Sequence, residues 1–168
     1  MLDQKNIELS KIRLQKSKKC YLSAIQDIRE EDYDSANNRA YYSMYHAIRS
    51  LLALEGLDFK KHSQTIGYFN KNYVHAKLIG AQFNKMIIEA SNSRNSSDYD
   101  DYYVATLEEA ETNTDNANKF IEAVKQYILA RFKAENIQGD FDADHANAIN
   151  PSDYGYCNET DDEEDLEV

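Results

Sequence analysis

Residues 36–54 read ANNRAYYSMYHAIRSLLAL and carry the most regular apolar pattern of this 168-residue chain. Apolar side chains recur there every three or four residues, at Ala36, Ala40, Met44, Ala47, Leu51 and Leu54. The stripe is widened by Tyr41, Tyr45, Ile48 and Leu52. This period is typical of an amphipathic α-helix, which we place near residues 33–55, with Gly56 well placed to end it.

Two further long helices are expected on either side of this one. Over residues 8–30, small and apolar side chains recur at spacings of three and four while lysines fall elsewhere around the wheel. Residues 106–133 show the same period, and Thr106 with Glu109 forms a capping box at the start. Both segments therefore read as amphipathic helices.

Two shorter helices are expected in the middle of the chain. Ser63 is placed to cap the first, which carries Ile66, Phe69 and Tyr73 on one face. The second carries Phe83, Met86, Ile87 and Ala90. It then runs into residues 91–97, whose serine and asparagine side chains compete with the helix backbone for hydrogen bonds. We expect the second helix to fray or bend there.

The composition favours an all-α fold. One proline, five glycines and no strand-like alternation argue against a many-stranded sandwich or barrel. Long helices joined by links without proline pack best as antiparallel neighbours, so we expect an up-and-down four- or five-helix bundle centred on the first, second and fifth helices. No run approaches the ~18 apolar residues of a membrane span, and no secretory signal is visible. These absences predict a soluble, cytoplasmic protein without a membrane partner.

The negative charge is concentrated at the end of the chain. The net charge of -11 comes from 30 acidic and 19 basic residues, and 11 of the acids, but no lysine or arginine, lie from Asp140 onward. Residues 1–139 are therefore balanced, with 19 charges of each sign. This division predicts a helical domain over 1–139 and a disordered acidic tail over 140–168.

Most familiar catalytic motifs are absent from the sequence. It contains no Gly-rich phosphate loop, no HExxH and no Cys/His cluster of metal-binding spacing. Its two cysteines, Cys20 and Cys157, are far apart in the sequence and unlike a redox pair. We therefore predict neither a cofactor nor a metal site.

One candidate site lies along the helix at 33–55. Arg39, Tyr42, His46 and Arg49 follow at spacings of three, four and three, with Asn38 beside them. Two guanidinium groups and two rings along one face suit a phosphate or a nucleotide base. In the alternative reading, the rings flank the core and the arginines are solvated or paired with acids of a neighbouring helix.

A second cluster follows the fourth helix. Arg94 is followed within ten residues by three acids and three tyrosines, which are Asp98, Tyr99, Asp100, Asp101, Tyr102 and Tyr103. In a helix, Arg94 and Asp98 lie one turn apart and can pair. An ion pair within a polar loop explains the acids but not the tyrosines. Arginine and tyrosine are both enriched at protein interfaces, which is the other reading of this cluster.

The two clusters together resemble the HEPN superfamily of helical nucleotide-binding and ribonuclease domains. The resemblance rests on residues 38–47 (NRAYYSMYHA), residues 61–63 (KHS) and Phe69, and then on Arg94 followed by residues 98–99 (DY). The sequence is most similar to the small, stand-alone prokaryotic members, and the match covers about residues 30–130.

The resemblance implies both a fold and a biological setting. It implies a helical bundle that forms a homodimer, with Arg-x4-6-His motifs of two subunits facing one another in a cleft. It also implies pairing with a minimal nucleotidyltransferase in toxin–antitoxin modules. In active members of the family, the motif is read as a metal-independent ribonuclease centre.

This chain departs from the motif at one position. Arg94 matches the motif arginine, but the positions four to six residues later hold no histidine and include Tyr99 and Asp100. Metal-free RNA cleavage needs a group that accepts the proton of the 2′-hydroxyl, and histidine suits this task near neutral pH whereas tyrosine does not. His46 and His62 are the histidines that folding into a bundle can bring near Arg94.

Two functions therefore stay open from the sequence. The favoured one is a noncatalytic HEPN module that binds RNA, a nucleotide or a nucleotidyltransferase partner through a dimer cleft around Arg94. The alternative is a metal-independent HEPN ribonuclease toxin. The candidate catalytic residues are Arg94, Asp98 and Tyr99. The candidate ligand-binding residues are Asn38, Arg39, Tyr42, His46, Arg49, His62 and Tyr102.

Overall fold

The described part of the chain consists of helices and their connections. A computed structural model describes residues 1–138, except for the side chain of Asp98, so the predicted acidic tail lies outside the described residues. The helices are α1 (Gln4–Arg29), α2 (Tyr33–Leu54), α3 (His62–Phe69), the short π-helix η1 (Asn70–Val74), α4 (Ala81–Tyr99) and α5 (Leu107–Ala134). No strand occurs within residues 1–138. The predicted all-α bundle is confirmed.

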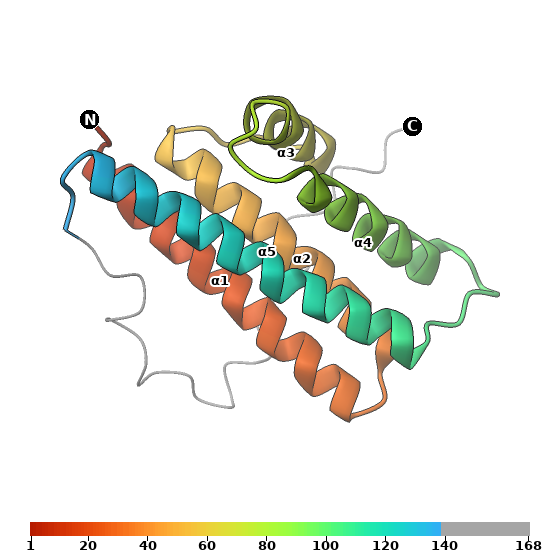
Figure 1. Cartoon of the computed structure of the whole chain (residues 1–168). Helices are drawn as coiled ribbons and strands as arrows, with labels where there is room; N and C mark the ends of the chain where they lie inside the picture. The colour runs from red at the N-terminus through yellow and green to blue at the C-terminus, as the bar shows by residue number, and fades with distance from the viewer. Residues whose placement is uncertain (139–168) are drawn as a thin grey trace.

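Helix α2 is the centre of the bundle. It packs against α1, α5, α4 and α3, and Figure 1 shows α1, α2 and α5 running alongside one another with α4 on the other side of α2. Sixteen of its 22 residues are buried, including every member of the predicted apolar stripe. Within residues 1–138, no helix is both long enough and apolar enough to cross a membrane.

Side chains set the helix starts. Asp3 accepts hydrogen bonds from the backbone N–H groups of Lys5 and Asn6, which starts α1 several residues earlier than the predicted residue 8. Thr106 caps α5 as predicted, accepting from the N–H of Glu109 at 3.2 Å. Ser63 was expected to cap α3, but the helix begins at His62 and its N-cap residue is Lys61. That shift places His62 in the first turn.

Gly56 ends α2 as predicted. Its φ of +69° lies in the left-handed region that favours glycine. A Cβ there would lie 3.1 Å from the side-chain nitrogen of Asn6 on α1, so a larger residue would be both strained and crowded. The chain thus turns sharply into the loop that leads to α3.

Helix α4 does not fray at residues 91–97, in contrast to the prediction; it continues to Tyr99. The hydroxyl of Ser93 donates to the carboxylate of Glu109 at 2.7 Å and accepts from the amide of Asn113 at 3.3 Å. Both partners lie on α5, so this serine does not compete with its own helix backbone. The extra turns carry Arg94 on a regular helix beside α2.

Candidate functional site

Arg94 reaches from α4 across to α2 and lies against two tyrosine rings. Its guanidinium carbon is 5.3 Å from the ring centre of Tyr41 and 5.2 Å from that of Tyr42. Such cation–π contacts contribute about 0.5–2 kcal/mol and restrict the side chain. Arg94 is half-buried, and α4 and α2 hold it in place together.

His62 joins the same group of rings from the start of α3. A hydrogen bond of 2.8 Å joins its Nδ1 to the hydroxyl of Tyr41, and its ring stacks on Tyr45 with 4.0 Å between centres. We call Tyr41, Tyr42, Tyr45 and His62 the aromatic cluster. The imidazole of His62 and the guanidinium of Arg94 therefore contact the same phenol ring, that of Tyr41.

Tyr42 contributes a polar atom to the aromatic cluster. The side chain is 8% exposed, and its ring packs edge-on against those of Tyr41 and His62. Its hydroxyl is buried and makes no hydrogen bond within the described part of the chain. Buried hydroxyls normally have a partner, so this one can bond to a polar ligand that reaches the aromatic cluster.

His46 lies deeper than His62 and is a much weaker base. Burial, followed by the positive charges of Lys16, Arg49 and Arg13, lowers the pKa of its imidazole to about 3. Its ring packs against Tyr42 and Tyr45. A neutral imidazole of this kind fills the core and is a poor proton acceptor near pH 7.

Arg49 is held by a carboxylate of the α2–α3 loop. Its guanidinium lies 3.1 Å from Asp58, and Arg13 of α1 donates to the same carboxylate at 2.6 Å. Burial alone would raise the pKa of the Asp58 carboxyl, but the two arginines lower it below its ordinary value. The ion pair considered as the alternative reading of the arginine stripe is thus present at Arg49, with a loop acid as its partner.

The other members of the predicted stripe point to different neighbours. Arg39 interacts with Asp27 of α1, whose pKa is raised to about 6 by burial although the charge of Arg39 acts against the rise. The side-chain oxygen of Asn38 is buried and makes no hydrogen bond within residues 1–138. The stripe is therefore divided: Arg39 interacts with Asp27, Arg49 pairs with Asp58, and Tyr42 belongs to the aromatic cluster, against which His46 packs.

Two of the three tyrosines after Arg94 are exposed. Tyr99 is exposed, Tyr102 is 94% exposed and Val104 is 78% exposed. Five residues separate Tyr99 from Arg94, which places the two about 140° apart around an α-helix. Of the candidate catalytic residues, Asp98 has a side chain outside the described residues, and a catalytic part for Tyr99 stays a prediction.

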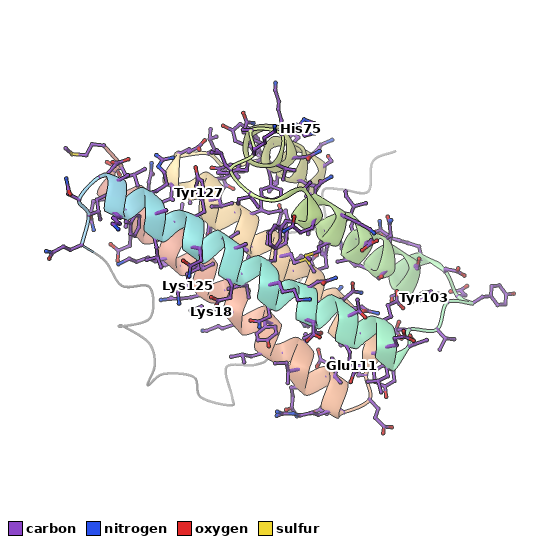
Figure 2. All side chains as sticks on the ribbon, in the orientation of Figure 1. Lys18, His75, Tyr103, Glu111, Lys125 and Tyr127 are labelled. Carbon is purple, nitrogen blue, oxygen red and sulfur yellow. The ribbon has the colours of Figure 1, made fainter. Side chains whose placement is uncertain are left out.

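Tyr103 binds back onto the bundle. Its hydroxyl donates to Glu109 near the start of α5 (Figure 2). Glu109 also accepts a hydrogen bond from the hydroxyl of Ser93. The side-chain amide of Asn113 donates to Ser93 and, at 2.8 Å, to the side-chain oxygen of Asn37 on α2. This polar network fixes the end of α4, and with it the position of Arg94.

Sequence reasoning missed Arg13, and it did not establish a contact for His62. Arg13 is 7% exposed and lies on α1 between the buried residues Ser10 and Ser17. The spacings of three and four from Ser10 to Arg13 and from Arg13 to Ser17 place the arginine on the buried face of α1, and this pattern could have indicated it. For His62 no local signal existed, because its contacts depend on how α3 turns back over α2.

Comparison with known proteins gives a consistent result. The model of the HEPN domain matches residues 10–127. A protein of Methanocaldococcus jannaschii named "Putative toxin" is 30% identical over 131 residues, which is 77% of this chain and 88% of the relative. A UPF0332 protein of Thermotoga maritima is 26% identical over 67% of this chain and 86% of the relative. A second "Putative toxin" of M. jannaschii is 31% identical over 57% of this chain and 71% of the relative.

Proposed function

This chain belongs to the HEPN domain family, and we propose that it binds a nucleotide unit at Arg94, beside the aromatic cluster. The unit is presented by single-stranded RNA or by a free nucleotide, which share the same phosphate and base chemistry. The proposal rests on one observation, the guanidinium of Arg94 lying over the rings of Tyr41 and Tyr42.

Each part of the site has a role in this proposal. A guanidinium group matches a phosphate with two parallel hydrogen bonds. The ring of His62, which is half-buried, can stack on a base of any sequence, while the buried rings of Tyr41, Tyr42 and Tyr45 support it and Arg94 from below. The buried hydroxyl of Tyr42 supplies a hydrogen bond that fixes the ligand's orientation. The names of the archaeal relatives support a role of the toxin type for this chain as well.

A binding titration tests this function. Fluorescence anisotropy of a short, end-labelled single-stranded RNA is followed as the full chain is added. Saturable binding is expected. Competition by a free nucleotide assigns the site to nucleotides, and competition only by unlabelled RNA assigns it to RNA. Absence of binding by both ligands at low salt would refute the proposal.

A second candidate function is metal-independent cleavage of the bound RNA. The contact of His62 with Tyr41 favours it, because it brings an imidazole to the ring that Arg94 covers. In this reaction His62 accepts the proton of the 2′-hydroxyl, the 2′-oxygen bonds to phosphorus, and the bond to the 5′-oxygen breaks. The leaving 5′-oxygen takes a proton from water, His62 returns its proton to solvent, and Arg94 stabilises the charge on the phosphorane.

We expect this reaction, where it occurs, to proceed in EDTA and to give 2′,3′-cyclic phosphate ends. His62→Gln should then abolish it, since the proton acceptor is lost. His75→Gln is the matched control, because His75 is exposed after η1 (Figure 2). No cleavage by the parent chain, or equal cleavage by His62→Gln, leaves the noncatalytic binding function in place and rejects the ribonuclease.

We further propose a symmetric homodimer that brings the two Arg94–Tyr103 segments together. The exposed rings of Tyr99 and Tyr102 support this interface, because tyrosine is enriched at interface centres, and Val104 adds an exposed apolar side chain next to them. Sedimentation at micromolar concentration should show a species near twice 19.4 kDa. Pairing with a nucleotidyltransferase stays a prediction of the family resemblance.

Replacing Tyr102 and Val104 together by aspartate should give the monomer, since the change places charges within the interface. Ile12→Asp serves as the control, because Ile12 is an exposed apolar residue on α1. A parent chain that stays monomeric at tenfold higher concentration contradicts the dimer, as does a double variant that dimerises like the parent.

A further inference from the structure

We propose that Arg13 and Arg49 form a second phosphate-binding site, which Asp58 occupies when no ligand is bound. The inference rests on the proposed function, because it makes the ligand an RNA strand that contacts the protein through at least two phosphates. Arg94 takes one phosphate, and the pair of arginines takes another.

The geometry around Asp58 is that of an anion site. Two guanidinium groups from different helices converge on one carboxylate, Arg13 at 2.6 Å and Arg49 at 3.1 and 3.3 Å. Arg13 is 7% exposed and is held in place by a further hydrogen bond of 3.2 Å to the backbone oxygen of Arg49. A phosphate accepts the same charge-assisted hydrogen bonds that the carboxylate accepts here.

Of the three side chains in this ion-pair cluster, that of Asp58 can move away from the other two. Its side chain is 53% exposed, far more than those of the two arginines. The loop has other anchors, since the N–H of Leu57 bonds to the oxygen of Leu52 at 3.0 Å and Phe59 packs against Tyr68. The carboxylate can therefore rotate into water without releasing the loop.

One buried donor at this site lacks a hydrogen bond. The Nε atom of Arg49 is buried and makes none within the described residues. A single carboxylate leaves this donor unsatisfied, whereas a phosphate offers more oxygen atoms. The two arginines also exceed Asp58 by one positive charge, which favours a more negative ligand.

The site is continuous with the aromatic cluster. The guanidinium of Arg49 lies 6.0 Å from the ring centre of Tyr45, which stacks on His62. Seven residues separate Tyr42 from Arg49 along α2, an axial rise of ~10 Å. Arg94 lies beside Tyr42 and Arg49 lies two turns further along α2, so we infer that a ligand contacting both arginines carries more than one phosphate.

Asp58→Asn tests the inference, because it removes the competing charge and keeps the shape of the side chain. Affinity for short RNA at low salt should rise about fivefold, and the gain should shrink as salt screens the charges. Glu111→Gln is the matched control, since it also removes one negative charge. Glu111 is exposed on α5, away from the α2–α3 loop (Figures 1 and 2).

A second readout uses inorganic phosphate and needs no RNA. Phosphate, compared with chloride at equal ionic strength, should raise the melting temperature of Asp58→Asn more than that of the parent or of Glu111→Gln. Arg49→Lys keeps the positive charge but loses the paired N–H donors of the guanidinium group. This variant should therefore lose most of the rise in melting temperature that phosphate causes. Equal phosphate shifts in Asp58→Asn and Glu111→Gln would overturn the second site. An RNA affinity lowered by Asp58→Asn would also overturn it, by showing that Asp58 supports the site.

These outcomes separate the two proposals. The proposed function stands if the parent binds RNA and Arg94→Ala does not. The second site fails if Asp58→Asn changes neither the affinity for RNA nor the shift in melting temperature caused by phosphate. If no chain binds RNA, the proposed function fails. The phosphate shift then still measures the site formed by Arg13 and Arg49.

Discussion

Arg94→Ala is expected to weaken the binding of short RNA by about ten- to a hundredfold. The side chain is proposed to make charge-assisted hydrogen bonds to phosphate, and such bonds contribute about 1.5–3 kcal/mol, which corresponds to that range of affinity. Its removal also ends the contacts with Tyr41 and Tyr42. The measurement is the anisotropy titration, made on samples whose folding is checked by circular dichroism.

The matched control is Arg29→Ala, which also removes one positive charge. Arg29 is exposed in the last turn of α1 and is not part of the aromatic cluster. We expect its affinity for RNA to stay within about twofold of the parent, the loss that general charge alone would cause. Equal losses in both variants would mean nonspecific attraction, and an Arg94→Ala chain that melts far below the parent would make the arginine structural.

The second large effect is a loss of stability in acid that depends on His46. Burial lowers the pKa of this imidazole in the folded chain to about 3, below the value of about 6.5 in an unfolded chain. The unfolded chain therefore binds more protons between these values, and stability falls as the pH drops. By linkage, the free energy of unfolding should decrease by about 2 kcal/mol from pH 7 to pH 5 through this group.

His46→Phe isolates that contribution, because the ring stays apolar and no longer titrates. Denaturant unfolding at pH 7 and pH 5 should show a smaller difference for His46→Phe than for the parent. Asp27 acts in the opposite direction, since its raised pKa costs stability as the pH rises, but it is present in both chains. Exposed His75→Phe should keep the parent's dependence on pH. An unchanged difference in His46→Phe would contradict the assignment.

The fold was largely predictable because its strongest signals are local. The apolar stripe and Gly56 predicted a helix over 33–55, and α2 covers Tyr33–Leu54. The failure at residues 91–97 had a distant cause. Ser93 bonds to Glu109, 16 residues further on, and no property of the serine itself indicates that partner. Side chains that bond across helices override local preference.

The residues of the candidate site could be proposed from the sequence, but the contacts among them could not. Arg94 and Tyr42 were expected to matter, yet their contact depends on how α4 packs against α2. The partner of Arg49 was harder still, because Asp58 lies in a loop and shares its carboxylate with Arg13 of α1. Contacts among three separate segments depend on tertiary packing, which helical periodicity does not encode.

The most direct test of the central claim is NMR spectroscopy of the full chain during titration with short single-stranded RNA. Binding at the proposed site should shift the side-chain Nε–H signal of Arg94 and the ring signals of Tyr42 and His62, and these shifts should saturate together. Saturable shifts that map elsewhere on the described bundle, with the signals of Arg94 and Tyr42 unchanged, would contradict the account.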